Sequence, residues 1–524
     1  MKTNKVLSLA LIFLLLGMTI IGCGTKDGEV SEQEEKTLIL AISEEIESTD
    51  VQQTYWQNVV HELLYDPIVG FDIDMKEIVP TLSSEYSVSE DGKELIFKIP
   101  SDLKYANGEQ VTLEDIKGSI LRYKEMSPYA ADFEPIQEII IDEDKLILKC
   151  DVPPAFMWAV LTSTSSGIVN PRAASEVDAS EFSQNAVTYG MTSVDEWVQG
   201  SHITLKRNPN YKSNNPIVDN KGPLKMEKIK VRFISDNFTR VTELQSGNVD
   251  IIWDVPSEKL EELKADENIN LYSYLQPGCE YINMNIDVPG LDDINVRKAI
   301  AMAIDRSELA QALNGTVEPR HGLLSPAMLG YSEDTETYLK NEMPNNIEEA
   351  KALLKEAGWE DVDNDGILEK GDQELKFTCL FNSDYSTSEK SAPIIQAQLK
   401  KIGVAIDIRE FESTYVKQQV RDRNYEMATR SYFWPDGDML MYLIHSNEGW
   451  IMNSELDSLL EEARITMSQE DRIAKYDEVQ RTFFNEIPAV PLFSNYYYIA
   501  ARKEVTGLKV ISSGATYMND INKE

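Results

Sequence analysis

A strand–helix–strand pattern near the middle of the chain constrains its fold more than any other feature. Apolar residues alternate with polar ones at 229–233, as in a half-buried strand. Val241 and Leu244 then share one side of a short helix that Gly247 can end, and 249–253 is strand-like again. Two strands joined through a helix normally lie parallel, with a right-handed crossover. This segment therefore predicts a sheet with parallel strands covered by helices.

The same alternation of strand and helix patterns continues along the chain after residue 36. The segment 85–100 predicts a hairpin around the turn residues Asp91 and Gly92. Helical patterns with capping or stop residues occur at 112–124, 295–304, 346–358 and 391–402 and, as two helices, within 454–485. These elements predict an α/β fold with mixed sheets, and 524 residues suffice for about three domains.

The beginning of the sequence predicts where the protein is located. Two lysines precede an uncharged apolar stretch at 6–21, as in a secretory signal peptide. The stretch leads into Ile-Ile-Gly-Cys, which resembles a bacterial lipobox, whose cysteine accepts fatty acyl chains. We expect a signal peptide at 1–22, a flexible tether at 23–36 that begins with lipidated Cys23, and a lipid anchor on the extracytoplasmic face of the cell membrane. The alternative is an ordinary secretory signal with an incidental cysteine.

Acidic side chains dominate the charge of the chain. There are 89 Asp and Glu residues against 50 Lys and Arg, which gives a formal net charge of -39. This charge repels the phosphates of nucleic acid, so no nucleic-acid partner is expected, and it opposes electrostatic adhesion to anionic lipid. Apart from Cys23, the three cysteines Cys150, Cys279 and Cys379 are expected to be buried free thiols rather than a disulfide pair, because Cys150 and Cys379 lie in strand-like segments. The sequence has no CxxC spacing, so it gives no support for a zinc or redox site.

The sequence contains no pattern typical of catalysis. Its four histidines are scattered, and His61-Glu62 lacks the second histidine of a zinc-protease helix. Neither a G-x-S-x-G elbow nor a Gly-rich phosphate loop occurs. We therefore expect a protein without enzyme activity and without a required cofactor. A surface-anchored enzyme, such as a hydrolase, is the alternative from a different class.

One acidic loop resembles an ion-binding motif. The segment 361–372 matches the spacing of an EF-hand loop, with Asp361, Asp363 and Asp365 at alternate positions and Gly366 at the sharp turn. Oxygen ligands at this spacing can converge on calcium, so these three aspartates are candidate metal ligands. The alternative is an acidic turn before a strand. A structural calcium ion would brace the loop and would take no part in any chemistry.

Several segments, in order, resemble the family 5 extracellular solute-binding proteins of bacteria, the group that binds oligopeptides, dipeptides and nickel. The run that matches best is Lys-Tyr-Ala-Asn-Gly-Glu-Gln-Val-Thr-Leu-Glu-Asp-Ile at 104–116, which is similar to the family's "kFxdGxpvTAeDV". The other matching segments are 64–69, 78–82, 86–97, 205–211, 245–250, 295–306 and 350–358. The likeness extends from about residue 38 to 510, which is nearly all of the chain after the leader.

The resemblance implies two lobes that close on a ligand around a hinge. The chain is expected to cross between the lobes near 276–281 and 488–494. Lobe 1 would then contain 37–277 and 489–524, with an extra subdomain at 71–187, and lobe 2 would contain 278–488. The resemblance also implies a monomer that delivers a small solute, with a peptide favoured, to the permease and ATPase of an ABC importer.

The candidate ligand-binding residues also follow from the resemblance. Trp253, Tyr281 and Trp434 lie on segments expected to end near the cleft, where aromatic rings can stack on a ligand. Family peptide binders hold the free amine through an aspartate that follows a tryptophan in lobe 2. Asp436 is the candidate here, although the best alignment puts Phe433 where the amine ligand should be.

A second departure lies at 188–191, where Thr-Tyr-Gly-Met replaces the family's usual "GTGPY". Together with the change at Phe433, it leaves a sugar, a metal chelate or another small solute as the alternative ligand.

Overall fold

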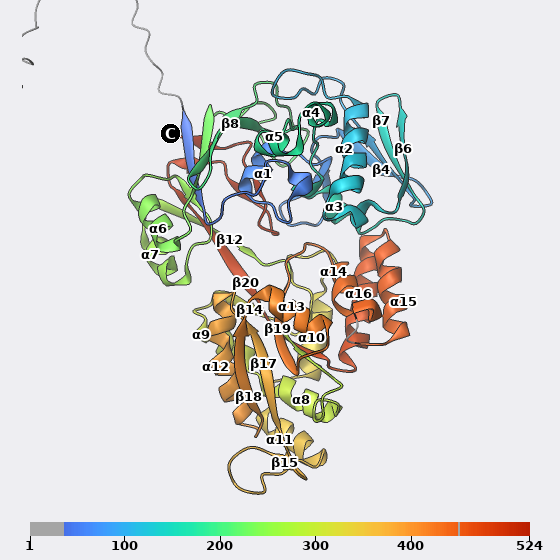
Figure 1. Ribbon diagram of the computed structural model, residues 1–524, viewed down its shortest axis with the longest axis vertical. Coiled ribbons are helices and arrows are strands. Elements are labelled where there is room, and N and C mark those ends of the chain that lie inside the picture. The colour runs from blue at the N-terminus through green and yellow to red at the C-terminus, as the bar shows by residue number, and fades with distance from the viewer. Residues whose placement is uncertain (1–35, 449–450) are drawn as a thin grey trace, which may run out of the picture. The chain divides into compact units, whose positions relative to one another are not determined.

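The computed structural model describes residues 36–448 and 451–524, and residues 36–524 form one compact unit. The predicted signal peptide, Cys23 and nearly all of the tether lie outside the described residues. Among the described residues, no helix combines the length and the apolar character needed to span a membrane. The predicted α/β class with mixed sheets is confirmed (Figure 1).

One large mixed sheet runs through this unit. Its strands, in spatial order, are β18 (Ala405–Phe411), β17 (Lys376–Asn382), β19 (Met427–Ser431), β13 (Glu280–Met284), β20 (Ala489–Arg502), β11 (Ile251–Ile252), β1 (Thr37–Ile42), β10 (Lys228–Phe233), β9 (His202–Arg207) and β8 (Thr192–Val198). Strands β12 (Ile269–Leu275) and β14 (Val317–Pro319) also pair with β20. The sheet therefore collects strands from almost the whole length of the chain.

The predicted strand–helix–strand segment forms β10, α6 (Asn237–Gln245) and β11. Both strands are parallel to β1, and β1 lies between them, so the two strands of the unit are separated by one place in the sheet. The sequence pattern could not show this insertion, because the inserted strand comes from the start of the described chain.

Strand β20 pairs with partners from two different parts of the molecule. Its first half pairs with β13 and β14, and its second half pairs with β12 and β11. The chain between β12 and β13 crosses beside it, since Leu275 lies opposite Tyr496 and Glu280 opposite Phe493. β12 and β20 are the strands that run between the upper and lower parts of the view in Figure 1.

Two large hydrophobic cores lie on either side of this crossing. One is built from residues between Leu38 and Ile251 and from Ile499 to Ile521, and the other from residues between Cys279 and Phe493. We use lobe 1 and lobe 2 for the parts of the chain around the first and the second core. The exact lobe and subdomain boundaries given above remain predictions.

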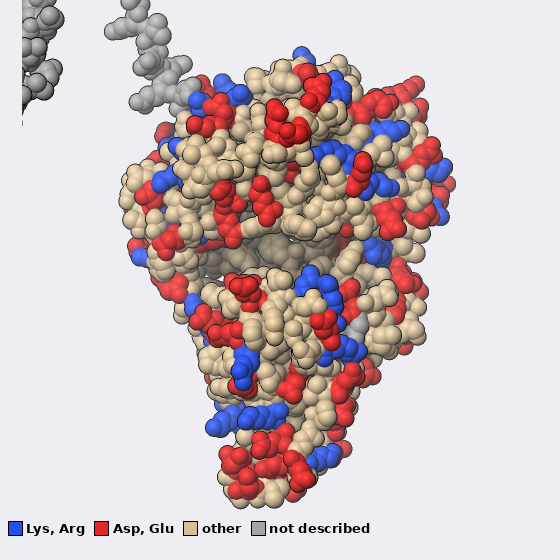
Figure 2. Space-filling model, in the orientation of Figure 1, with Lys and Arg blue, Asp and Glu red and all other residues tan. Residues whose placement is uncertain are grey.

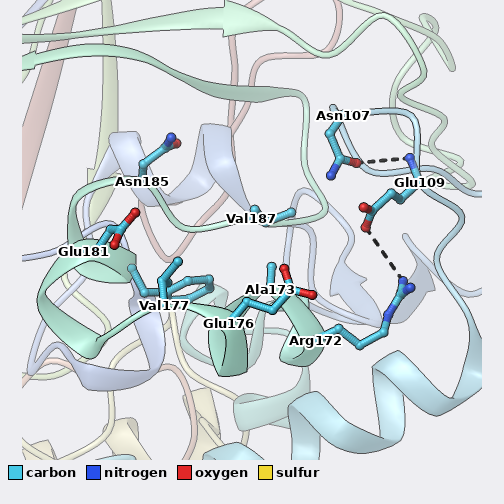
Figure 3. Close-up of a pocket in the computed structure, with 10 residues that line it drawn as sticks. Asn107, Glu109, Arg172, Ala173, Glu176, Val177, Glu181, Asn185 and Val187 are labelled. Atoms are coloured by element: carbon cyan, nitrogen blue, oxygen red, sulfur yellow. Dashed lines mark hydrogen bonds and ion pairs between the residues drawn. The ribbon is translucent and has the colours of Figure 1, made fainter.

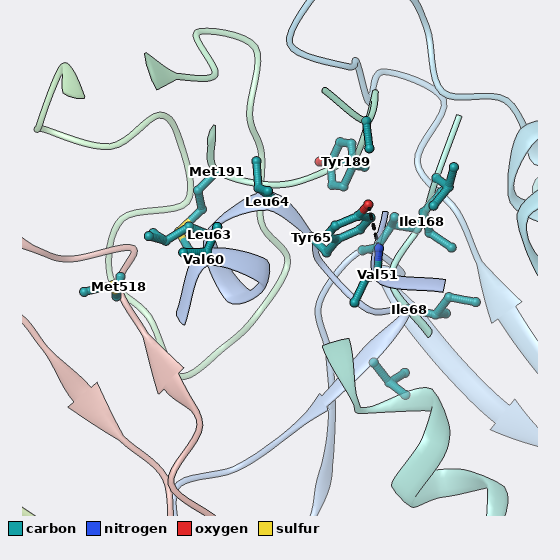
Figure 4. Packing of buried hydrophobic residues seen from close by; sticks show 14 of the residues in the cluster. Val51, Val60, Leu63, Leu64, Tyr65, Ile68, Ile168, Tyr189, Met191 and Met518 are labelled. Atoms are coloured by element: carbon teal, nitrogen blue, oxygen red, sulfur yellow. Dashed lines mark hydrogen bonds between the residues drawn. The ribbon is translucent and has the colours of Figure 1, made fainter. Parts of the chain in front are cut away.

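Figure 4 shows part of the lobe 1 core, around α1 (Val59–Leu64). The Tyr65 ring is buried there, and its hydroxyl donates to the Thr49 carbonyl at 2.6 Å while accepting from the Val51 N–H at 3.3 Å. A buried tyrosine with a satisfied hydroxyl adds apolar contact without leaving a polar group unpaired. This packing holds the segment before α1 against the rest of lobe 1.

Lobe 1 also contains an antiparallel sheet in the order β4 (Glu85–Val88), β5 (Glu94–Lys98), β7 (Lys145–Cys150) and β6 (Ile136–Asp142). The predicted hairpin is its β4–β5 pair, and Gly92 in the connecting turn has φ +74°. Helix α2 (Leu113–Met126) begins at a capping box in which Thr112 and Asp115 exchange hydrogen bonds. The remaining lobe 1 elements are β2 (Val69–Phe71), β3 (Ile78–Pro80), α3 (Met157–Leu161), α4 (Pro171–Glu176), α5 (Ala179–Gln184), α7 (Leu260–Ala265) and the short strands β21 (Val505–Thr506), β22 (Lys509–Val510), β23 (Thr516–Tyr517) and β24 (Asn522–Lys523).

Helices pack around the lobe 2 strands, of which β17, β18 and β19 are parallel. These helices are α8 (Ile294–Ala303), α9 (Arg306–Ala312), α10 (Glu333–Glu342), α11 (Ile347–Glu356), α12 (Ser386–Lys400), α13 (Ser413–Arg421), α14 (Met439–Ile444), α15 (Ser454–Ile465) and α16 (Gln469–Phe484), and the strands β15 (Glu369–Lys370) and β16 (Gln373–Glu374) form a small hairpin. Two predicted boundaries were wrong. Helix α8 is capped by Asp293 rather than by Asn295, and α12 begins five residues before the predicted 391, with Pro393 inside it.

Candidate functional site

The candidate site is the hollow between lobe 1 and lobe 2, which Figure 2 shows on one face of the molecule. The crossing formed by β12, β13 and β20 joins the two lobes beside this hollow. A strand pair that connects two separate cores is the usual place for a hinge around which lobes close. We call this region the hinge cleft.

Polar side chains fix the path of the chain at the crossing. The Gln276 amide donates to the Tyr432 carbonyl at 2.6 Å and accepts from the Asn495 amide at 2.9 Å. The Ser494 hydroxyl donates to the Gly278 carbonyl at 2.6 Å. Gly278 has φ +152°, and a Cβ added there would overlap the carbonyl oxygen of Tyr432. The crossing therefore depends on a glycine at this position.

Aromatic rings gather beside the crossing. Tyr274 and Tyr497, which lie opposite each other on β12 and β20, stack with ring centroids 5.5 Å apart. Phe433 is half exposed and meets Tyr497 edge-on at 6.2 Å. Trp253 and Trp434, both predicted ligand contacts, are partly buried and pack against the lobe 1 core. Since Trp434 lies in the chain between β19 and α14, it brings lobe 2 into contact with lobe 1.

Tyr281 occupies a more enclosed position than the other predicted aromatic contacts. Its side chain is completely buried, its ring meets Tyr432 at 6.4 Å, and its residue lies opposite Arg430 on the neighbouring strand. Burial raises the pKa of its hydroxyl, which has no hydrogen-bond partner among the described residues. Tyr281 is therefore part of the lobe 2 core in this conformation.

Asp436 lies in an environment that the sequence did not indicate. Its carboxylate is fully buried and receives two hydrogen bonds from the Arg472 guanidinium, each 2.7 Å long. The same carboxylate accepts from the Asp438 N–H at 2.8 Å. The pair raises the pKa of Arg472, and Arg472 also contacts the Tyr476 hydroxyl at 3.0 Å. Both oxygens of Asp436 are thus engaged inside lobe 2, where they tie the loop before α14 to α16.

Sequence reasoning missed two other carboxylates at the hinge cleft. Glu280 is the first residue of β13 and is 1% exposed, and Asp254 follows Trp253 at the end of β11 and is exposed. Burial raises the pKa of Glu280 to about 7. Glu280 lies inside the predicted crossing at 276–281, so an acidic residue in that segment was the available signal.

Contacts on two sides of the hinge cleft connect the lobes. Lys390 of α12 forms an ion pair with Glu258 of lobe 1 at 2.9 Å, and both side chains are exposed. The Arg464 guanidinium of α15 lies 4.1 Å from the centre of the Phe156 ring in lobe 1. The described conformation is therefore one in which the lobes touch.

Two surface pockets lie within lobe 1, away from the crossing in sequence. One has a volume of about 350 Å³ and is lined by charged residues that include Glu109 and Arg172 (Figure 3). Arg172 is held there by Asp115 at 2.8 Å. The other pocket, about 790 Å³, lies between the segments 100–104 and 209–223. Neither pocket involves residues of lobe 2.

The predicted ion-binding loop brings its acidic groups together. Single carboxylate oxygens of Asp361, Asp363, Asp365 and Glu369 all lie within 4.8 Å of one another, and the three aspartates are exposed. Asp372, at the twelfth position of the motif, is not among them. The Asp363 and Asp365 carboxylates also accept hydrogen bonds from backbone N–H groups two residues further on. Carboxylate oxygens gathered in this way are the type of ligand that calcium prefers.

Comparisons with known proteins agree on one family. The model described as bacterial extracellular solute-binding proteins, family 5 Middle, matches residues 77–452. A probable D,D-dipeptide-binding periplasmic protein, DdpA of Escherichia coli K12, is 25% identical over 443 residues, which is 81% of each chain.

Solved structures show the same fold. NikA from Brucella suis in complex with Fe(III)-EDTA has a TM-score of 0.80 at 19% identity, covering 93% of this chain and all of that one. The oligopeptide-binding protein AppA from Bacillus subtilis, in complex with a nonapeptide, has a TM-score of 0.72 at 20% identity, covering 93% and 99% of the two chains.

Proposed function

The chain belongs to family 5 of the bacterial extracellular solute-binding proteins, and from this premise we propose that it captures a peptide between its two lobes and delivers it to the permease and ATPase of an ABC importer. The family consists of binding components of transporters rather than of enzymes. The observation that carries the proposal is the crossing at β20, where one strand serves both cores and leaves a cleft beside it.

A peptide is favoured over other solutes because proteins similar to this chain are described as peptide binders. A relative in Escherichia coli is described as a probable D,D-dipeptide-binding periplasmic protein, and a protein of the same fold holds a nonapeptide. A sugar or a metal chelate remains the alternative, since another protein of this fold holds Fe(III)-EDTA. Acidic groups at the hinge cleft favour the peptide over an anionic chelate.

Native mass spectrometry tests the proposal directly. The mature protein, purified without refolding, is expected to carry extra mass, and fragmentation of the released compound is expected to give amino-acid losses. If the released compound is a sugar or a metal chelate, the ligand belongs to that class and is not a peptide. Turnover of the bound compound by the protein would instead indicate an enzyme.

Lipid anchoring at Cys23 is the second part of the proposal. It rests on the lipobox-like sequence before the cysteine, and an acylated cysteine would keep the protein at the extracytoplasmic face beside its permease. Changing Cys23→Ser is expected to abolish labelling by radioactive palmitate and to leave the protein unprocessed or released. Equal labelling of the variant would contradict the anchor.

Calcium in the acidic loop is a third and separate proposal. Asp361, Asp363 and Asp365 would supply ligands together with Glu369, and the ion would relieve the repulsion among their charges. Added calcium is expected to raise the melting temperature of the wild type and not that of Asp363→Asn. An equal response of both proteins would show that calcium does not act at this loop.

A further inference from the structure

One acidic residue from each lobe lies in a segment that adjoins β20, the strand that carries Tyr497 of the stacked tyrosine pair. Burial raises the pKa of the Tyr497 and Tyr274 hydroxyls. The negative charge of Asp254 raises both pKa values further, and the charge of Glu280 adds to the rise at Tyr497. Asp254 belongs to lobe 1 and Glu280 to lobe 2. The geometry agrees: Val255, next to Asp254, donates its backbone N–H to the Tyr498 carbonyl at 3.3 Å, and Glu280 lies opposite Phe493 on the same strand, β20.

Glu280 is a buried carboxylate with one oxygen left free. Its Oε2 accepts a hydrogen bond from the Thr387 hydroxyl at 3.4 Å, and its Oε1 has no partner among the described residues. An unpaired buried carboxylate oxygen is costly, so this one requires an explanation. Among the described residues, no basic side chain contributes to the pKa shift of Glu280.

Capping of α12 is the structural alternative for Glu280. The carboxylate lies beside Thr387 and Ser388 in the first turn of that helix, and Tyr385 at the N-cap makes no side-chain cap. The helix terminus stabilises a negative charge there. This contact accounts for one side of the carboxylate and leaves Oε1 without a partner.

Asp254 is held in place from behind. Its backbone has φ +56°, an unusual value for a residue with a side chain. The buried Arg240 guanidinium donates to the carbonyls of Trp253 and Asp254, each at 3.3 Å. Among the described residues, the Asp254 carboxylate itself accepts a hydrogen bond from the Ser43 hydroxyl alone, at 3.1 Å. The buried Arg240 therefore holds the backbone of this turn through hydrogen bonds, while the Asp254 carboxylate stays exposed.

Neither carboxylate is directly paired with a described lysine or arginine side chain. Within 36–448 and 451–524, neither the Asp254 nor the Glu280 side chain forms an ion pair or a hydrogen bond with a basic side chain. Arg240 is near enough for the charge of Asp254 to oppose the lowering of the Arg240 pKa by burial, but its hydrogen bonds at this turn go to backbone carbonyls. Arg430 lies opposite Tyr281, and successive residues of a strand face opposite sides, so it is on the other face of β13 from Glu280.

We propose that Glu280 and Asp254, together with the rings of Tyr274, Tyr497 and Phe433, form a subsite for a positively charged ammonium group of the ligand. Carboxylates neutralise such a group, and aromatic faces attract it through their quadrupoles. The inference rests on the proposed function, because it supposes that a solute enters the hinge cleft. It assigns the charge recognition to Glu280 and Asp254 in place of Asp436, whose oxygens are taken by Arg472.

For a ligand to use this subsite, the lobes must separate far enough to expose the free oxygen of Glu280. Glu280 lies at the crossing itself, and its Oε1 is enclosed in the described conformation, in which the lobes touch. A ligand that enters the open cleft can therefore meet Glu280 first and Asp254 as the lobes close. The two sources of an ammonium group, a peptide α-amine and a quaternary amine, share this chemistry.

Matched pairs of charged and neutral compounds test the subsite by calorimetry. The panel is trialanine with N-acetyl-trialanine, and choline with 3,3-dimethylbutanol. We expect at least one cation to bind about thirty-fold or more tightly than its neutral partner, since losing one member of a buried charge pair typically has an effect of this size. Trialanine as the binder would identify an α-amine, and choline a quaternary amine.

Variants of the two carboxylates test whether these residues cause the preference for the cation. Glu280→Gln and Asp254→Asn are each expected to remove most of the preference for the cation, whereas Glu356→Gln, an exposed change on α11, is expected to keep it. Two variants at separate sites keep the test valid if one of them folds poorly, which melting curves would show. An unchanged preference in both well-folded variants would overturn the subsite.

The failure of the subsite and the failure of solute capture give different results. A wild type that binds none of the cations, or binds cation and neutral partner equally, overturns the ammonium subsite. In that case a ligand found by native mass spectrometry would still support solute capture. Only protein that carries no ligand from any source and does not change its dimensions with any solute would count against capture itself.

Discussion

At the scale of single residues, Asp436 shows how a side chain with the right chemistry can serve the fold instead of the ligand. The buried pair with Arg472 joins the loop before α14 to α16 through two parallel hydrogen bonds. Removing one member of a buried pair leaves the other charge uncompensated, which typically costs about 3–5 kcal/mol.

Changing Asp436→Asn is therefore expected to lower the free energy of unfolding of lobe 2 by roughly 3 kcal/mol. Urea unfolding followed by tryptophan fluorescence measures this change. Ligand affinity of the protein that remains folded is expected to change only a few-fold. A large loss of affinity with unchanged stability would return Asp436 to the role of ligand contact.

Asp66 gives a prediction about pH. Burial raises the pKa of its carboxyl to about 7, and the Tyr211 hydroxyl donates to it at 2.7 Å. The folded state therefore binds more protons at this group than the unfolded state between about pH 4 and 7. Its contribution to stability is fully present below the unfolded pKa and is lost as the pH rises through 7.

Asp66→Asn removes this titration. The stability of the wild type relative to the variant is expected to fall from pH 4.5 to pH 8, by about 1.4 kcal/mol for each unit of pKa difference. Melting curves of both proteins at these pH values measure the change. Parallel stability curves would mean that the carboxyl is already charged in the fold.

At the scale of elements, the crossing between β12 and β13 depends on Gly278. Because an added Cβ would overlap the Tyr432 carbonyl, Gly278→Ala is expected to shift the crossing, lower the melting temperature by several degrees and weaken ligand binding. Gly315→Ala is the matched control, since Gly315 also has a positive φ, +69°, but has open space around it. Equal effects of the two changes would show that backbone conformation alone matters.

The elements were predictable from the sequence where a local signal decides them. The β4–β5 hairpin follows from Asp91-Gly92, and the start of α2 follows from Thr112 and its capping box. The order of strands in the sheet was not predictable, because the place of β1 between β10 and β11 depends on long-range pairing.

The candidate site was harder to predict than the fold. Aromatic residues near the crossing were found because they adjoin recognisable segments. The partner of Asp436 could not be found, since Arg472 lies 36 residues further on and nothing in its local sequence marks it as buried. Glu280 was missed for the opposite reason, because burial of an acidic residue in a strand contradicts the usual pattern.

At the scale of the whole molecule, solute capture requires the lobes to move. The radius of gyration from small-angle scattering is expected to fall when ligand is added, because a ligand that contacts both lobes favours closure. Ligand-free and saturated samples of the same preparation provide the comparison. An unchanged radius at saturation would contradict closure around β20.

The exposed ion pair between Lys390 and Glu258 gives a second prediction about closure. Lys390→Glu places two like charges across the cleft and is expected to lower ligand affinity a few-fold at low salt, since exposed pairs contribute only about 0.2–1 kcal/mol. Calorimetry at low and high salt measures this effect. The double change Lys390→Glu with Glu258→Lys should restore the affinity, and failure to do so would exclude the pair from closure.

The sharing of β20 also has a consequence for the time at which the protein can fold. A ribosome synthesises a chain from its N-terminus. Ile251 pairs with Ala501 of β20, so this pairing in the lobe 1 sheet cannot form until Ala501 has been synthesised. Asn283 of lobe 2 waits in the same way for Ala489. Neither lobe can complete its sheet until β20 has been synthesised. Such a delay suits a polypeptide that is exported in an unfolded state, because it postpones the finished fold until both lobes have been made.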